Sequence, residues 1–469
     1  MKKTKIAPFD FRFRRLAGGR VLLTNDLGAW AVLKREEFSR FAAGRAGPGA
    51  AAAKLAAGGF VRNRLDMEGA AASLRERFFA GWKGPHVHIV SLNDRCNQSC
   101  SYCGALAGRG TSGGMTRAVA EKTLDFIFSI KVPSVMIEFQ GGEPLLDFKT
   151  LKFMVAGARR RAAELGREVR FSVVTNLGLM DRAKMIFLLD NGVTVCTSLD
   201  GPADLHDANR PSPGGSAHRL AAKWIGELIK AGSPRAGFET PNAVCTVTRA
   251  SLGRAREIVD EYVRLGVMRV QLGPLDPLGR ARTAWAVLGY SGAEFLEFHR
   301  AALERILELN GRGVPVYEKG VLSFVKQIFS GARPRYQNLD LVYRLAYNRD
   351  GGIYGSDEAR MLANSGDRFF RLGSVRSDTF GGLLKKPLAQ FLWHSCLNPL
   401  CQPACARCAY SAYCRPSPVY NYIAQNSPWG NMAINERCAI YKGMLDLIFG
   451  LMRQKKAMAV FKKWDGLYA

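Results

Sequence analysis

The chain has 469 residues, of which 47% are hydrophobic and 23% charged, and its formal net charge is +27. These values are those of a globular protein with two or three domains. No apolar run approaches the roughly 18–20 residues that a membrane helix needs, and the basic N-terminus lacks the apolar stretch of a signal peptide. We therefore expect a cytoplasmic protein with no membrane partner. In the reducing cytoplasm, we expect its eleven cysteines to be metal ligands or buried apolar residues in preference to disulfides.

The positive charge suits three kinds of partner: nucleic acid, an acidic peptide or an anionic membrane. However, the basic residues are spread along the whole chain, and the run Arg159–Arg161 falls on a segment with helical periodicity. This distribution favours ordinary solvated surface. No RNA-binding appendage is recognisable, which argues against nucleic acid as a partner.

Residues 1–83 are predicted to form a small α+β module. The segments FRFRRLAGG and RVLLTND predict a hairpin, AWAVL predicts a third strand, and short helices follow. Such a module is compatible with a winged-helix element that captures a leader peptide by β-strand addition. Its basic residues would suit an acidic leader: Arg12, Arg14, Arg15 and Arg20.

Residues 84–290 alternate between short β-branched runs and amphipathic runs of helical period. The expected strands are 86–93, 134–140, 169–176, 193–200, 242–248 and 268–275. Six βα units in series predict an α/β fold with a parallel sheet and right-handed crossovers. Six units are too few for a closed eight-stranded barrel, so an open sheet or a partial barrel is expected.

The rest of the chain divides into three further segments. Residues 291–345 are predicted to form a helical connector. Residues 346–445 are rich in Pro, Gly and Cys and are expected to be irregular, and residues 446–469 read as a helical tail.

Three cysteines follow the first expected strand of the core at a C-x3-C-x2-C spacing: Cys96, Cys100 and Cys103. In parallel α/β folds, the loops at the carboxyl ends of strands bind ligands. Three thiolates can hold three irons of a [4Fe–4S] cluster and leave the fourth iron open. The alternatives are a zinc site or three unrelated thiols.

Polar and small residues end the next three strands. Two glycines permit close backbone approach, and a carboxylate offers an acceptor for an ammonium group. The alternative is that these residues serve tight turns and caps. The residues are Gly141, Gly142, Glu143 and Pro144 after the second strand, Thr175 and Asn176 after the third, and Ser198 and Asp200 after the fourth.

The segment CNQSCSYC, with Tyr102 before its last cysteine, together with QGGEP, resembles the radical S-adenosylmethionine (SAM) superfamily. The resemblance implies a partial (β/α)6 barrel and a [4Fe–4S] cluster whose open iron binds SAM. It implies that Gly141–Pro144 contact the amino group of SAM and that Ser198 and Asp200 lie near its ribose or methionine part. The segment HDANR is similar to one that recurs in peptide-modifying members, and His206 within it is read as structural.

A second set of cysteines follows the C-x2-C-x5-C spacing and ends with a distant fourth: Cys405, Cys408, Cys414 and Cys438. This resembles the SPASM extension and implies one auxiliary [4Fe–4S] cluster on these four thiols, with a zinc site as the alternative. Pro418, Ser356 and Asp357 stand where that pattern carries ligands of another cluster, which is therefore expected to be lost. Cys396 and Cys401 either restore a modified cluster site as ligands or are packing cysteines, and Cys196 and Cys245 are expected in the core.

SPASM-type enzymes mostly act on peptides, and the N-terminal segment resembles radical SAM maturases of the His-Xaa-Ser system. The resemblance implies reductive cleavage of SAM, hydrogen abstraction by a 5′-deoxyadenosyl radical and an oxidative modification of a His-Xaa-Ser repeat protein. It also implies a flavodoxin or ferredoxin as electron donor and a second radical SAM enzyme as partner. The alternatives are an enzyme like the anaerobic sulfatase maturases, an RNA-modifying radical SAM enzyme, and a metal-binding scaffold without catalysis. No residue is assigned as catalytic acid or base.

Overall fold

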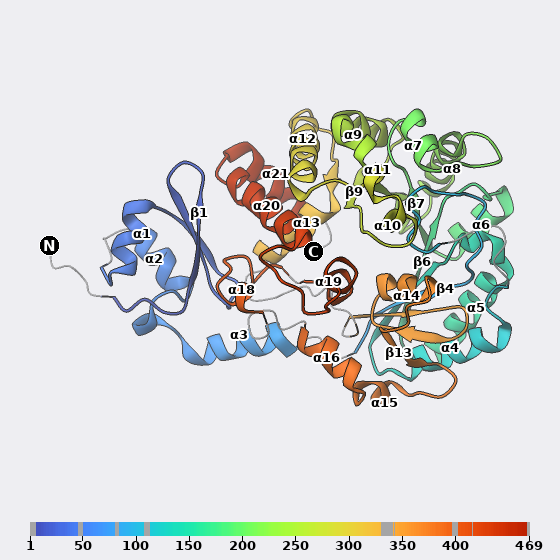
Figure 1. Cartoon of the computed structure of the whole chain (residues 1–469), viewed down its shortest axis with the longest axis horizontal. Helices are drawn as coiled ribbons and strands as arrows, with labels where there is room; N and C mark the ends of the chain where they lie inside the picture. The colour runs from blue at the N-terminus through green and yellow to red at the C-terminus, as the bar shows by residue number, and fades with distance from the viewer. Residues whose placement is uncertain are drawn as a thin grey trace.

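The computed structural model describes residues 6–45, 50–79, 84–106, 113–329, 341, 343–395, 402–414 and 416–466. A small N-terminal module lies at one end of the molecule, beside a larger body that contains the main sheet (Figure 1). Cys396 and Cys401 lie outside the described residues, so both interpretations of these cysteines stay predictions.

The N-terminal module is an antiparallel sheet in the order β1-β2-β3 with three helices. Its own hydrophobic cluster includes Leu23, Leu33 and Phe41, which explains why this short segment folds around a separate core. The predicted hairpin, third strand and following helices are confirmed. The elements are β1 (Arg12–Leu16), β2 (Arg20–Thr24), β3 (Trp30–Lys34), α1 (Arg35–Ala42), α2 (Ala50–Ala57) and α3 (Met67–Phe79).

The main sheet has ten strands in the order β10-β9-β8-β7-β6-β5-β4-β11-β12-β13. Strands β4 to β9 are parallel and adjacent in chain order, which confirms all six predicted core strands and the α/β fold class. They are β4 (Val87–Ser91), β5 (Ser134–Gln140), β6 (Glu168–Thr175), β7 (Val193–Ser198), β8 (Asn242–Val247) and β9 (Arg269–Pro274).

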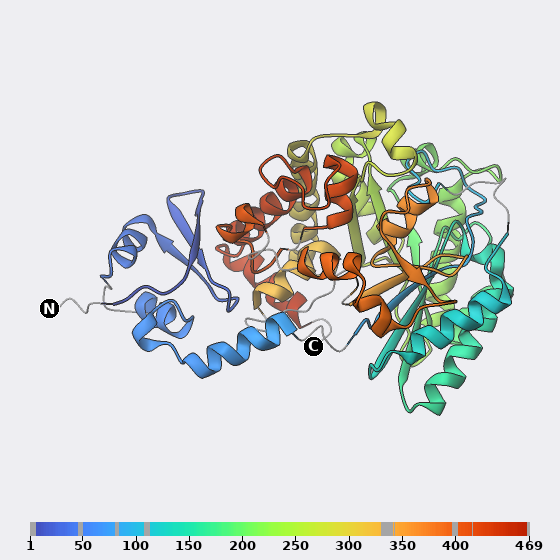
Figure 2. The same ribbon diagram turned by 60° about the horizontal axis from the view of Figure 1, so that its bottom comes forward.

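Helices of the core cover the outer side of this sheet (Figure 2). Alternate residues of β5 are buried, and those between them are half-buried, so the sheet has a helix-covered face and an inner face. Several helices begin at a side-chain cap; Thr116 and Ser216, for example, accept from backbone N–H groups three residues on. The helices are α4 (Arg117–Ser129), α5 (Phe148–Glu164), α6 (Arg182–Asp190), α7 (Ala203–Asn209), α8 (Ala217–Gly232) and α9 (Ala255–Arg264).

The expectation that residues 346–445 are irregular is wrong in part. Strand β11 pairs in parallel with β4, and β12 and β13 continue the sheet in antiparallel fashion. These strands have only three or four residues, too few for an alternating pattern to show in the sequence. The added elements are β11 (Arg344–Tyr347), β12 (Gly352–Tyr354), β13 (Arg371–Ser374), α14 (Asp357–Asn364), α15 (Phe380–Leu384), α16 (Pro387–Ser395), α18 (Pro403–Ala406) and α19 (Pro418–Gln425).

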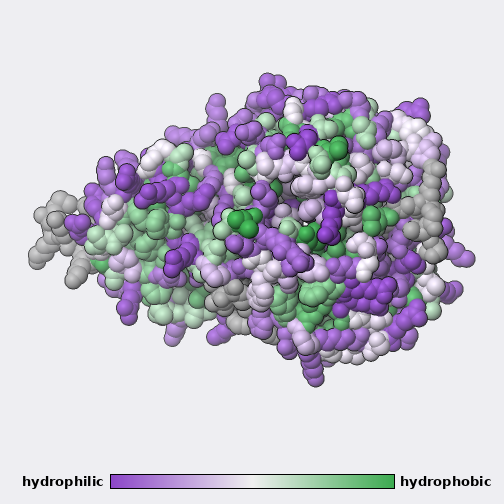
Figure 3. All heavy atoms as spheres, viewed as in Figure 1, coloured by the Kyte–Doolittle hydropathy of each residue, from purple (hydrophilic) through white to green (hydrophobic). Residues whose placement is uncertain are grey.

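The expected helical connector and tail are present. The elements are α10 (Arg280–Thr283), α11 (Trp285–Leu288), α12 (Gly292–Gly311), β10 (Tyr317–Glu318), α13 (Lys319–Phe329), α20 (Glu436–Leu451) and α21 (Lys455–Asp465). Within the described ranges, no helix combines the length and the apolar character that crossing a membrane requires. Hydrophilic side chains are spread over the face shown in Figure 3, with smaller hydrophobic areas between them.

Candidate cofactor site and auxiliary thiol site

The loop that carries Cys96, Cys100 and Cys103 follows β4 at the carboxyl edge of the parallel sheet. Segments from later in the chain hold its backbone. The amide N–H of Ser101 donates to the carbonyl of Asn209 (2.9 Å), and that of Arg280 donates to the carbonyl of Cys103 (3.0 Å). The three half-buried cysteines are not in disulfides. All three thiols thus lie on one loop at this edge of the sheet, and the cluster expected on them stays a prediction.

N–H groups point at two of the three sulfurs. Asn176 Nδ2 lies 3.6 Å from Cys96 Sγ, and Arg210 Nη1 lies 3.9 Å from Cys100 Sγ. Burial raises the pKa of Cys96 to about 12 and also raises that of Cys100. Burial thus disfavours free thiolates at these positions, and the charge of Arg210 acts against that shift at Cys100. Three thiols with N–H donors to sulfur fit an iron–sulfur group.

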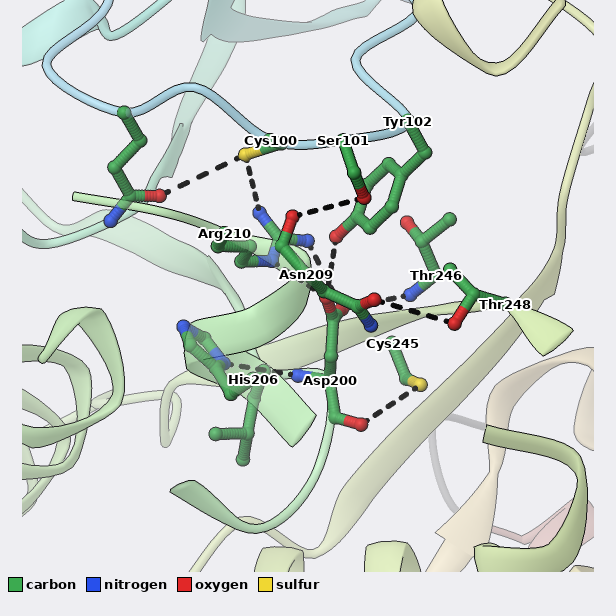
Figure 4. Close-up of polar contacts among 12 residues, drawn as sticks. Cys100, Ser101, Tyr102, Asp200, His206, Asn209, Arg210, Cys245, Thr246 and Thr248 are labelled. Atoms are coloured by element: carbon green, nitrogen blue, oxygen red, sulfur yellow. Dashed lines mark hydrogen bonds and ion pairs between the residues drawn. The ribbon is translucent and has the colours of Figure 1, made fainter. Parts of the chain in front are cut away.

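Asp200 ties the cysteine loop to the sheet (Figure 4). Its buried carboxylate accepts hydrogen bonds from Tyr102 Oη (2.6 Å), Arg210 Nε (3.0 Å) and the backbone N–H of Thr246 (3.1 Å). The guanidinium of Arg210 also lies over the ring of Tyr102, 5.2 Å from its centroid. Tyr102 and Asp200 thus lie at the site, but in the described contacts they hold the loop in place.

The carboxylate of Glu143 is fully buried, and its expected contact with the amino group of SAM stays a prediction. It accepts from Thr175 Oγ1 (2.7 Å) and from the backbone N–H groups of Asn176 (2.9 Å) and Leu145 (3.0 Å). Burial raises its pKa, whereas these three donors act against that shift. Glu143 therefore links the turn after β5 to the end of β6.

The two glycines of this turn serve a close approach between protein segments. Gly141 has φ +142°, and a Cβ atom there would lie 2.4 Å from the carbonyl oxygen of Asn93. The N–H of Gly142 donates to the same carbonyl (2.8 Å). The turn consequently lies against the start of the cysteine loop, and Pro144 begins the short 3-10 helix Pro144–Asp147 behind it.

The remaining predicted residues lie at the same edge. Asn176 bonds the side chain of Asn97 (2.9 Å) within the cysteine loop. Ser198 ends β7 and is half-buried. His206 accepts a hydrogen bond at Nδ1 from the N–H of Asp200 (3.2 Å), which is the structural role expected for it.

Two basic residues at the site were not predicted from the sequence. Arg210 is buried, pairs with Asp200 and approaches Cys100. Arg280 donates from Nη1 to the carbonyl of Cys100 (3.1 Å). Arg210 belongs to the segment HDANR, and the similarity of this segment to one in peptide-modifying enzymes could have indicated its importance. The sequence around Arg280 contains no comparable motif.

The second set of cysteines lines one small pocket, whose cavity volume is about 20 Å³. Cys405, Cys408 and Cys414 come from the loop at α18, and Cys438 comes from the first turn of α20. The residues around the pocket are Ala404, Cys405, Cys408, Tyr410, Ser411, Cys414, Met432, Cys438, Lys442 and Leu445. Four thiols from two distant segments thus line the same pocket, and four thiols are a donor set that an iron–sulfur group takes. In the described ranges, no three His, Cys, Asp or Glu side chains are placed to hold a single metal ion.

Ser356 and Asp357 lie at the start of α14. In the SPASM pattern this position carries a ligand of another cluster. Ser356 Oγ accepts from the N–H of Ala359 (3.3 Å), and Asp357 pairs with Arg360 (2.7 Å). Pro418 begins α19. Cys196 lies half-buried in β7, while Cys245 is buried in β8, so the expected core position is met fully by Cys245 alone.

Part of the chain is similar in sequence to known proteins. Residues 90–234 match the family model described as the Radical SAM superfamily. An uncharacterized protein of Methanocaldococcus jannaschii is 24% identical over 190 residues, which are 40% of this chain and 62% of that protein. The serine-type anaerobic sulfatase-maturating enzyme of Klebsiella aerogenes is 27% identical over 199 residues, 42% of this chain and 48% of the enzyme. The chain thus spans about half the length of the curated relatives it matches.

Two solved structures share the fold. Native anSMEcpe with bound AdoMet superposes with a TM-score of 0.66 at 18% identity and covers 81% of this chain and 100% of its own. Streptococcus suis SuiB bound to S-adenosylmethionine gives a TM-score of 0.53 at 15% identity, covering 91% and 98%. Residues 90–234 are therefore similar to the Radical SAM superfamily, and the chain shares its fold with these two solved structures.

Proposed function

We propose that the chain is a radical SAM peptide or protein maturase. The observation that carries this proposal is the group of three half-buried thiols on one loop at the carboxyl edge of the sheet, with N–H donors directed at two sulfurs. Cys96, Cys100 and Cys103 would hold a [4Fe–4S] cluster. When cluster and SAM are bound, they supply a 5′-deoxyadenosyl radical that abstracts a hydrogen atom.

The neighbouring residues would position SAM and hold the cysteine loop. The turn Gly141–Pro144 and the side chains of Asn176 and Ser198 lie at the edge where SAM would bind. Thr175, Tyr102 and Asp200 are engaged within the protein, so we assign them to holding the turn and the loop. Arg210 supplies positive charge beside Cys100.

We further propose one auxiliary [4Fe–4S] cluster on Cys405, Cys408, Cys414 and Cys438. The pocket that these thiols line supports the assignment. Such a cluster suits an oxidative modification because it can bind substrate or accept an electron as the product forms. In this scheme residues 1–83 form the peptide-binding module, 84–290 the radical SAM core, 291–345 a connector, 346–445 the auxiliary domain and 446–469 the tail.

A peptide substrate is supported by the solved structures: SuiB has been seen bound to the precursor peptide SuiA, and anSMEcpe with the Cp18Cys peptide. For this chain we propose a His-Xaa-Ser repeat protein as substrate, a second radical SAM enzyme of the same system, a flavodoxin or ferredoxin as electron donor, and the cytoplasm as the location. The similarity to the anaerobic sulfatase-maturating enzyme of Klebsiella aerogenes favours a second candidate, a sulfatase-maturase-like activity.

The proposed chemistry is tested by SAM cleavage. The chain is reconstituted anaerobically with iron and sulfide, reduced with dithionite and given SAM; 5′-deoxyadenosine is then measured. The wild-type chain should form it and Cys100→Ala should not, whereas Cys196→Ala, which removes a thiol of β7, should behave as wild type. A fully iron-loaded wild-type chain that forms none would contradict the proposal.

The substrate is tested separately by co-expression with a His-Xaa-Ser repeat protein and mass spectrometry of that protein. A mass change that needs Cys100 supports the maturase assignment. Modification of a sulfatase-type peptide in place of the repeat protein would support the second candidate.

A further inference from the structure

The N-terminal module contacts the loop that carries three of the four auxiliary thiols (Figures 1 and 2). Thr24 Oγ1 of β2 donates to the carbonyl of Ala409 (2.7 Å), and Arg12 Nε of β1 donates to the carbonyl of Ala406 (2.6 Å). In the opposite direction, Tyr413 Oη of the loop donates to the carbonyl of Gly28 (3.0 Å). The module and the loop are thus joined by hydrogen bonds that run both ways.

These bonds fall between the cysteines. Ala406 stands between Cys405 and Cys408, while Ala409 and Tyr413 stand between Cys408 and Cys414. Thr24 and Tyr413 are each 1% exposed, so a carbonyl that lost its donor here would gain little from water. The position of the loop backbone, and with it the position of the thiols, therefore depends on the module.

Side-chain packing joins the same parts. Arg14 of β1 pairs with Asp446 of α20, which also accepts from Tyr410 Oη (2.5 Å) in the pocket wall. The rings of Trp30 and Tyr410 both lie against Phe449, at 5.6 and 5.9 Å. The module, α20 and the pocket wall form one packed unit.

We propose that the β1–β3 sheet is an outer wall of the auxiliary site and that Thr24, Arg12 and Tyr413 are positioning residues for its thiols. This inference rests on the auxiliary cluster of the proposed function. It follows that a peptide bound to the module would change the environment of the auxiliary cluster, because the two share these contacts.

The test uses the full chain with Cys96, Cys100 and Cys103 replaced by alanine, so that iron is held at the auxiliary site alone. After anaerobic loading with ferrous iron and sulfide, iron release to EDTA and the EPR spectrum of the reduced protein are measured. Thr24→Val and Tyr413→Phe should each release iron about tenfold faster, the size expected for a buried hydrogen bond lost with its partner left unpaired, and should alter the EPR line shape. Thr24→Ser keeps the hydroxyl and should restore slow release.

A matched control breaks a contact of the module away from the thiol loop. Arg453 Nη1 donates to the carbonyl of Ala17 (3.0 Å), and Arg453→Gln should leave iron release and the EPR spectrum unchanged. Equal release by Thr24→Val and its parent would overturn the inference, as would an equal effect of Arg453→Gln. A parent chain that holds no iron would overturn it as well, while SAM cleavage by the wild-type chain would still stand as a separate result.

Discussion

Asp200 joins three parts of the candidate site through one carboxylate. It is fully buried, and its partners come from the cysteine loop, from the segment after α7 and from β8. A buried carboxylate is stable only when it is paired and hydrogen-bonded. Asp200 meets this condition through Arg210, so both residues are needed for the loop to stay in place.

Breaking this pair should destabilise the protein strongly. Arg210→Met leaves the Asp200 carboxylate buried without its cation and should lower the free energy of unfolding by about 3–5 kcal/mol. The exposed pair Arg170–Glu168, with side chains 67% and 56% exposed, provides the control. Arg170→Met should cost less than about 1 kcal/mol. Urea unfolding of both variants measures the difference. An equal loss in the free energy of unfolding would contradict the prediction for the Asp200–Arg210 pair.

His206 should make the protein sensitive to acid. Burial lowers its pKa to about 4, below the unperturbed value of about 6.5. Between these values the unfolded chain binds a proton that the folded chain does not, so stability falls as the pH falls from about 6.5 to 4. His206→Gln should reduce this slope. Buried His88, whose pKa is lowered to about 3, should keep part of it. Urea midpoints from pH 7.5 to 4.5 give the slope, and an unchanged slope in His206→Gln would contradict the assignment.

At the scale of elements, strands of five to eight residues could be predicted from the sequence, and strands of two to four could not. Strand β5 has seven residues with clear alternation and was located correctly. Strand β12 has three residues and depends on pairing with β11 and β13. A strand this short is stabilised by its neighbours, which a local pattern does not contain.

The turn after β5 offers a prediction about an element boundary. Gly141→Ala would place a Cβ atom 2.4 Å from the carbonyl oxygen of Asn93 at φ +142°, so the turn or the cysteine loop must move. The variant should hold markedly less iron at the cysteine loop after reconstitution. Gly226→Ala in α8, where a Cβ meets no atom within 4 Å, should load as wild type and be slightly more stable. Iron assay of both variants decides the matter.

At the scale of the whole molecule, the iron content should report two separate thiol sites. On four irons per cluster, the reconstituted chain should hold about eight irons. Cys438→Ala removes the thiol that α20 brings to the auxiliary pocket and should leave about four, with SAM cleavage by the first site retained. A full complement of eight in this variant would exclude Cys438 as a ligand.

From the sequence alone, the six parallel core strands, the cysteine spacings and the shared carboxyl edge of those strands could be predicted. These depend on periodicity and on the rule that the carboxyl ends of parallel strands share one edge. Three contacts between distant groups became visible only in the folded chain: Glu143 is buried against Thr175, Arg210 pairs with Asp200, and the N-terminal sheet contacts the auxiliary thiol loop. The partners in these contacts are, in the same order, 32, 10 and 385 residues apart. Contacts of this kind form by packing and charge pairing in the folded state, and neither leaves a pattern in adjacent residues.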